Sequence, residues 1–198
     1  MLSAKGRALI ARAIILVILL VLAATPGTAS TIELIVNGGF ETGDFTGWTI
    51  TGADVYGVDY GITGQNPNSG SYSAWFGAVS GMTYLSQIVD TVPGQTYDAS
   101  FWGANFNQGD NPQNQIQVYL NGTLMLDGAN EPDIGWTLVE GTFVATSTAT
   151  ELEFAFNNVP GWWQIDDVSI TAATPEPAAL LCCGAGLALV FVLRRRRC

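Results

Sequence analysis

The residues from Thr31 to Thr171 form a succession of short apolar-patterned runs, separated by Gly, Asn, Asp and Pro. Many of the runs alternate with a period of two, so that Tyr97, Ala99 and Phe101 would lie on one side of an extended strand. No segment in this part of the sequence keeps the period of about 3.6 residues that marks an amphipathic helix. The pattern therefore predicts an all-β sandwich.

The alternating runs place the expected strands along the sequence. They are Leu34–Val36, Trp48–Thr51, Tyr72–Phe76, Thr83–Val89, Thr96–Trp102, Ile116–Leu120, Leu124–Asp127, Trp136–Ala145, Glu151–Phe156 and Trp163–Ile170. Between two of these strands stands Asn121-Gly122, a pair that favours a tight hairpin because a type I′ turn needs positive φ at both central residues. Trp48 is expected in the core, as is at least one of Trp162 and Trp163, which follow a Pro-Gly turn.

Charge is strongly segregated in this sequence. All seven Lys and Arg lie near the two ends, and no Lys, Arg, His or Cys occurs between Thr31 and Leu181. Nucleic acid is excluded as a partner, since its binding depends on Lys and Arg that neutralise phosphates. Ser-His-Asp and Cys-His catalysis, the usual zinc sites and Schiff-base chemistry are excluded too. Only pairs of carboxylates remain as catalysts, and nothing marks one of them, so we expect no enzyme activity.

The two ends of the sequence are expected to be targeting segments. Residues 1–30 combine early basic residues, an apolar run and small residues before the end, as a secretory signal peptide does; an uncleaved N-terminal anchor is the alternative. Residues 31–173 then form the β-sandwich domain. Residues 174–198 form a tail whose apolar part, Ala178 to Leu193, is expected to be a single hydrophobic helix, followed by Arg194 to Arg197 on the cytoplasmic side.

The tail resembles a known sorting signal. The sequence "TPEP", with Pro175, Glu176 and Pro177 directly before the apolar segment and the arginine cluster, is similar to the PEP-CTERM signal of Gram-negative bacteria that make exopolysaccharide. The resemblance implies processing by an exosortase, a membrane anchor in the inner membrane before that processing, and a final place at the cell surface or in the extracellular matrix. A plain C-terminal anchor shares this topology and is the alternative.

The domain itself resembles another family. The segments "LIVNGGFETGDFTGW", "SGSYSAWFG", "VPGQTYDASFW", "WTLVEGTFVA" and "WWQIDDVSI" follow one another as in the galactose-binding-like jelly roll of family 4/9/22 carbohydrate-binding modules. The resemblance implies a structural calcium bound by the backbone oxygen of Gly39 and the carboxylates of Glu41 and Asp166. By parity with Val168 and Ile170, Asp166 is expected to point inward and Asp167 outward, unless a bulge exchanges them. In the alternative, Glu41 and Asp166 only accept local hydrogen bonds.

Five side chains are candidates for sugar binding, because a sugar ring stacks on an aromatic ring while its hydroxyls need polar partners. They alternate with apolar neighbours in their strands and are expected to share one outward sheet face: Trp75, Trp102, Gln115, Gln117 and Tyr119. In the alternative, these rings only cover the sheet under long loops.

These observations predict an exported, surface-sorted, non-catalytic β-sandwich that binds carbohydrate, such as an exopolysaccharide matrix. A structural or adhesive biofilm-matrix protein without a defined glycan site is the alternative from a different class. A glycoside hydrolase is less favoured, because it needs two carboxylates facing each other across a cleft.

Overall fold

The computed structural model describes residues 31–52, 59–78, 81–107, 113–159 and 161–173. Ten strands run through these residues, and no helix occurs among them. The strands are β1 (Thr49–Gly52), β2 (Tyr60–Thr63), β3 (Ser73–Phe76), β4 (Thr83–Asp90), β5 (Thr96–Asn107), β6 (Gln113–Leu120), β7 (Thr123–Ala129), β8 (Ile134–Val144), β9 (Ala149–Val159) and β10 (Gly161–Ala172).

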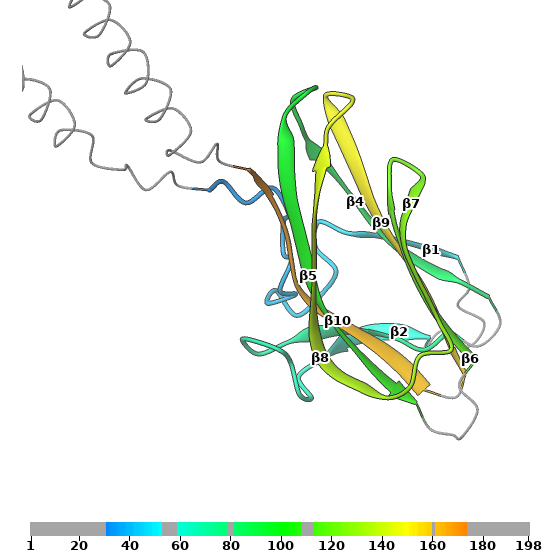
Figure 1. Ribbon diagram of the computed structural model, residues 1–198. Coiled ribbons are helices and arrows are strands. Elements are labelled where there is room, and N and C mark those ends of the chain that lie inside the picture. The colour runs from blue at the N-terminus through cyan, green and yellow to red at the C-terminus, as the bar shows by residue number, and fades with distance from the viewer. Residues whose placement is uncertain (1–30, 53–58, 79–80, 108–112, 160, 174–198) are drawn as a thin grey trace, which may run out of the picture. The chain divides into compact units, whose positions relative to one another are not determined.

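The strands form two antiparallel sheets. Sheet I has the order β1-β4-β9-β6-β7, and sheet II has the order β2-β3-β10-β5-β8. Figure 1 shows β5, β8 and β10 beside one another, and β4, β9, β6 and β7 in the other layer. This architecture confirms the expected all-β sandwich. The expected helices at the two ends lie outside the described residues.

Aromatic side chains join the inner faces of the two sheets. Phe76 of sheet II stacks on Phe156 of sheet I, with ring centroids 4.2 Å apart, and Phe101 meets Phe154 edge to face at 5.1 Å. The alternation of the sequence sets these contacts, because every second residue of β3, β5 and β9 faces the core. Trp48 is buried in the same cluster, as predicted.

Nine of the expected strands are present, and one is wrong. Leu34–Val36 forms no strand. Next to it lies an isolated bridge between Glu33 and Thr171, and Leu34 donates its backbone N–H to Ile170 at 2.9 Å. The backbone N–H and C=O of Val36 bond to the side chain of Gln87, at 2.7 and 3.0 Å. The strand β2, only four residues long, was not predicted; its pairing with β3 shows that it is a strand.

Two local predictions have clear outcomes. The β6–β7 hairpin turns at Asn121 and Gly122, whose φ values of 48° and 72° are both positive, as predicted. Trp162 and Trp163 both lie near the start of β10, which begins two residues before the predicted strand. Trp163 is buried in the core, as expected of at least one of the pair, and Trp162 stacks on Phe106 at 5.8 Å.

Candidate functional site

The structure divides the five predicted sugar-binding residues between two faces. Trp75 lies in β3 and Trp102 in β5, both strands of sheet II, whereas Gln115, Gln117 and Tyr119 lie in β6 of sheet I. In each strand the buried residues alternate with these side chains, so all five point away from the core. The expected single platform is therefore wrong: the outer faces of two packed sheets look in opposite directions. The periodicity of the sequence predicted correctly that these side chains point outward, but it could not show which sheet each strand belongs to.

On the outer face of sheet I, the polar side chains of β6 form a hydrogen-bonded row. The side-chain amides of Gln115 and Gln117 donate to the same oxygen of Asp127 on β7, at 2.9 and 3.2 Å. The Tyr119 hydroxyl donates to the side-chain oxygen of Gln117 at 2.8 Å. All three β6 side chains are partly exposed. They are held in fixed orientations and keep further lone pairs and protons for a ligand.

The register of sheet I brings further residues to the same outer face. Tyr84 of β4 pairs with Ala155 of β9, which pairs with Gln117 of β6, so the small Ala155 lies between two larger side chains. Two residues further along the same pair of strands, Tyr119 is directly opposite Glu153. Tyr84 and Glu153 were not among the predicted binding residues, although each alternates with core residues along its strand. What the sequence lacked was the strand order, which makes β4, β9 and β6 neighbours.

Glu153 has an unusual environment for a surface carboxyl. Partial burial raises its pKa above the ordinary value, and the nearby Glu151 adds to the shift by like-charge repulsion. Both side chains come from β9 and share the outer face, two residues apart. This carboxyl lies where its oxygens can accept hydrogen bonds from the hydroxyls of a sugar.

The outer face of sheet II is more closely covered. The Trp75 indole lies against Gly61 of β2, where an added Cβ would come within 2.7 Å of its Nε1. The segment of residues 64–72 also crosses this side, since Trp136 of β8 donates its indole N–H to the Asn66 carbonyl at 2.9 Å. Trp75 and Trp102 are both half-buried. On the outer face of sheet II, the tryptophan rings therefore pack against strands and against the segment of residues 64–72.

The expected calcium ligands lie at the start and the end of the domain, and Asp166 does not point inward as parity predicts, because β10 contains a bulge of the kind named as the exception. Asp166 pairs with Trp102 and Ser169 with Ser100, so two residues of β10, Asp167 and Val168, stand where β5 has one. Asp167 adopts a left-handed φ of 49°, which accommodates the extra residue of this bulge. Asp166 therefore points to the outer side of sheet II, where the segment 64–72 buries it fully.

The carboxylates in this region bind the backbone of one segment. Asp166 accepts N–H bonds from Asn68 and Ser69, at 2.9 and 3.2 Å, and a third from Asp167 at 2.8 Å. The side chains of Asn68 and Ser69 donate in turn to the Asp167 carboxylate, at 2.8 and 2.7 Å. The two adjacent aspartates thus hold the same loop and do not point to opposite sides.

Glu41 fixes the next residues of that segment. Its carboxylate accepts the N–H of Ser71 at 2.8 Å and that of Tyr72 at 2.9 Å. Gly70 lies so close that an added Cβ would stand 2.4 Å from Glu41 Oε1. The hydrogen-bonding role considered as the alternative is therefore present for both Glu41 and Asp166.

Whether these residues suit a cation can be tested on their charges and positions. A Cβ at Gly39 would stand 3.5 Å from Asp167 Oδ1 and 3.8 Å from Asp166 Oδ1, so the acids gather around the Gly39 backbone. Burial raises the pKa of Asp166 to about 6, against the lowering effect of its hydrogen bonds, and residues 31–173 contain no Lys, Arg or His to neutralise it. Among the described residues no group of three or more acids, His or Cys is close enough to hold a metal alone. The set fits calcium only with carbonyl or water oxygens completing its coordination.

Comparison with protein-family models identifies the domain. A model described as a carbohydrate binding domain, of the 4/9 type, matches residues 33–161. The chain belongs to this family. The match spans strands from both sheets and includes the whole outer face of sheet I described above.

Among curated proteins, this carbohydrate-binding domain is similar to part of the endo-1,4-beta-xylanase A of Thermoanaerobacterium saccharolyticum. The two are 30% identical over 154 residues, which are 70% of this chain and 12% of the xylanase. The chain thus spans about an eighth of that relative.

Solved structures share the fold. A family 61 carbohydrate-binding module in complex with beta-1,4-galactotriose has a TM-score of 0.57 and 20% identity, covering 72% of this chain and 99% of that one. The K1 cleaved adhesin domain of Lys-gingipain from Porphyromonas gingivalis has a TM-score of 0.52 and 14% identity, covering 74% and 100%. These likenesses confirm the jelly-roll sandwich.

The predicted sorting motif of Pro175, Glu176 and Pro177 lies outside the described residues, as does the apolar run that follows it. Within the part of the chain that the structure describes, no helix is long and apolar enough to cross a membrane.

Proposed function

We propose that this domain is a non-catalytic glycan-binding module whose binding surface is the outer face of sheet I. The observation that carries the proposal is the convergence on that face of Tyr84 and Tyr119 with the hydrogen-bonded row of Gln115, Gln117 and Asp127. Tyrosine rings offer stacking surfaces to the C–H faces of sugar rings, and amide and carboxyl groups serve the hydroxyls. Membership of a carbohydrate-binding family supports the same role.

The spacing of the two tyrosines favours an oligosaccharide over a single sugar. Tyr84 and Tyr119 lie two strands apart and are offset by two residues along β9, so their Cα atoms are roughly 12 Å apart at ordinary sheet spacings. This span is wider than one sugar ring. A chain laid across β9 would meet one tyrosine on each side and pass over the small Ala155 and the carboxyl of Glu153.

The charge of the face favours a neutral glycan. Glu151, Glu153 and Asp127 lie on it, and no cationic side chain exists in residues 31–173 to attract a uronic acid or a sulfate. The galactotriose bound to the family 61 module and the xylan named in the xylanase relative are both β-1,4-linked, which supports a neutral β-1,4-linked backbone as the ligand class.

Affinity electrophoresis tests this function. The domain of residues 31–173 is run through gels that contain neutral β-1,4-linked polysaccharides, such as xylan or galactan, or acidic ones such as alginate. We expect retardation by a neutral polymer that Tyr119→Ala abolishes, while Trp102→Ala retains it. Retention in Tyr119→Ala with loss in Trp102→Ala would move the site to sheet II. No retardation by any polymer would favour the structural or adhesive matrix protein.

A structural calcium belongs to the same proposal, supported by the gathering of Gly39, Glu41 and Asp166 and by the lack of any other cation. The metal would join the first segment of the domain to β10 and to the loop at Asn68, and would offset the cost of the buried Asp166 charge. Calorimetric titration of chelator-treated domain with calcium tests it. A heat signal absent from Asp166→Asn supports the site, and no signal in the unaltered domain refutes it.

Export and surface sorting complete the proposal and depend on the two ends of the sequence. The signal-like residues 1–30 and the tail with Pro175, Glu176 and Pro177 support secretion, temporary anchoring in the inner membrane and processing by an exosortase-type enzyme. Mass spectrometry of the protein recovered from a native exopolysaccharide-producing host would show the processed C-terminus. Replacement of Glu176 by Ala should leave the tail attached; an intact tail in the unaltered protein would support a plain anchor.

A further inference from the structure

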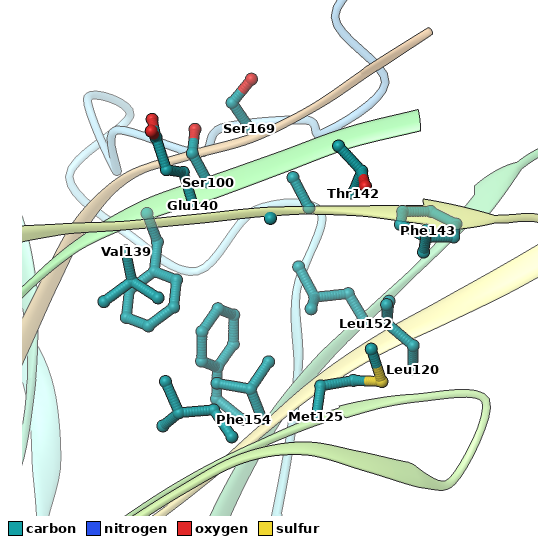
Figure 2. A pocket seen from close by; sticks show the side chains of 15 residues that line it. Ser100, Leu120, Met125, Val139, Glu140, Thr142, Phe143, Leu152, Phe154 and Ser169 are labelled. Atoms are coloured by element: carbon teal, nitrogen blue, oxygen red, sulfur yellow. The ribbon is translucent and has the colours of Figure 1, made fainter. Parts of the chain in front are cut away.

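An apolar pocket opens between the two sheets, away from the outer faces. It lies where β8, the edge strand of sheet II, faces the β6–β7 hairpin at the edge of sheet I. Its volume is about 210 Å³. Figure 2 shows Val139, Leu152, Phe154, Leu120 and Met125 around it, contributed by strands of both sheets.

The pocket exists because two small residues meet on the inner face of sheet II. Gly141 of β8 is paired directly with Ala99 of β5, between the larger inward residues Val139 and Phe143. A Cβ added to Gly141 would meet nothing within 4 Å. A bulkier pair at this position would reach toward Leu126 and Leu152 of sheet I and fill the space.

Neither backbone conformation nor packing requires glycine at position 141. Its φ lies outside the left-handed range, and it stands in the interior of an 11-residue strand. Glycine in such a place weakens a strand and often marks the close approach of a ligand or another backbone. Since no protein atom approaches here, the empty space beside Gly141 is the feature that needs a physical explanation.

The chemistry of the walls selects the ligand. Figure 2 places Ser100, Glu140 and Ser169 on the opposite side of the strands from Val139, Leu152 and Phe154, in agreement with their outward positions in the register. The space itself is therefore bounded by hydrocarbon side chains. A sugar bound here would leave its hydroxyls without hydrogen-bond partners, which costs free energy, whereas an aliphatic chain has no polar groups to satisfy. Apolar cavities of about 150 Å³ are known to bind molecules as small as benzene.

Charge narrows the ligand further. Glu140 lies on the strand that forms the rim, and no Lys, Arg or His occurs in residues 31–173. A fatty acid or phospholipid head group would therefore find like charge and no cationic partner. We propose that the Gly141 pocket binds the aliphatic chain of an uncharged amphiphile, independently of the glycan face of sheet I.

The test titrates octan-1-ol into the domain of residues 31–173 and follows methyl chemical shifts by NMR. This part is suitable because it forms one compact unit, and a solved module of the same fold stands as a chain by itself. We expect saturable shifts at Leu126, Val139 and Leu152, and much weaker binding of octanoate. Absence of saturable shifts overturns the proposal, as does binding of octanoate equal to that of octanol.

Gly141→Val is the deciding variant. Each methylene excluded from a pocket weakens binding about fourfold, so three added carbons should reduce octanol affinity more than tenfold. The melting temperature should rise, which shows that the variant folds. Gly135→Val is the matched control, because Gly135 lies in the same strand, also has open space around its Cβ position and does not line the pocket.

Three further outcomes separate this proposal from its competitors. Unchanged octanol binding in Gly141→Val refutes it. A dimer of the unaltered domain in sedimentation, lost in Gly141→Val, would assign the pocket to a second copy of the chain and also refute it. Retention on polysaccharide gels should be equal in Gly141→Val and the unaltered domain, so failure of the glycan proposal and failure of this one are distinguishable.

Discussion

The buried carboxyl of Asp166 should make the stability of the metal-free domain depend on pH in a direction opposite to that of most paired acids. Its side chain is fully buried, and burial raises its pKa from 3.8 to about 6. Between these two values the folded state binds more protons at this group than the unfolded state. The free energy of unfolding therefore falls as pH rises from about 4 to about 6 and stays at the lower level above.

The size of the effect follows from the shift. A difference of about two pH units in pKa corresponds to about 3 kcal/mol. In a domain of this size such a loss lowers the melting temperature by about 10 °C. Calcium should reverse the trend, because it binds the ionised carboxylate and therefore stabilises the domain more at pH 7 than at pH 4.5.

Urea unfolding in chelator at a series of pH values measures this directly, with the fluorescence of the buried Trp48 and Trp163 as the signal. Because other carboxyls also titrate, the quantity to compare is the difference between the unaltered domain and Asp166→Asn. The amide of the Asp166→Asn variant has one acceptor oxygen fewer at every pH, which adds a constant to the difference in free energy of unfolding. Only the pH-dependent part of that difference reports the ionisation of Asp166. Asp98→Asn, at an exposed position of β5, is the control. Parallel curves for the unaltered domain and Asp166→Asn between pH 4 and 7 would refute the reasoning.

Three further predictions concern the scaffold. Phe156→Ala should cost about 3–5 kcal/mol in urea unfolding, because it removes the ring that stacks on Phe76 between the sheets; a cost below 1 kcal/mol would contradict that packing. Gly122→Ala should cost about 1 kcal/mol, from its φ of 72° alone, since its Cβ would meet no atom within 4 Å, and thermal unfolding would show this. Gly70→Ala should displace the Glu41 carboxylate and weaken calcium binding in titration calorimetry by tenfold or more, and unchanged affinity would remove Glu41 from the site.

The class of fold and the inward and outward sides of the strands could be predicted from the sequence. Alternation fixes which residues of a strand share a side, and Tyr97, Ala99 and Phe101, expected on one side of their strand, all pack in or against the core. It says nothing about which strands are neighbours, because that depends on contacts between distant segments. Trp75 and Tyr119 were therefore assigned to one face although their strands belong to different sheets.

The bulge at Asp167 shows a second limit of the same kind. Parity counted from Val168 predicts an inward Asp166, and one extra residue in the strand reverses the prediction. The bulge could be considered only as an alternative, because Asp tolerates a left-handed φ without requiring one. The three residues grouped by the motif resemblance, Gly39, Glu41 and Asp166, do lie around one loop, although Asp166 points to the other side of the sheet from the one that parity predicts.

The most direct test of the glycan-binding face is an NMR titration of the ¹⁵N-labelled domain with a neutral β-1,4-linked oligosaccharide. The outer faces of the two sheets look in opposite directions, so the set of amides that shift identifies the face without any substitution. We predict that the shifts concentrate at Gln117, Tyr119 and Glu153 of sheet I. Shifts concentrated at Trp75 and Trp102 of sheet II, or none at all with every neutral oligosaccharide tried, would contradict the account.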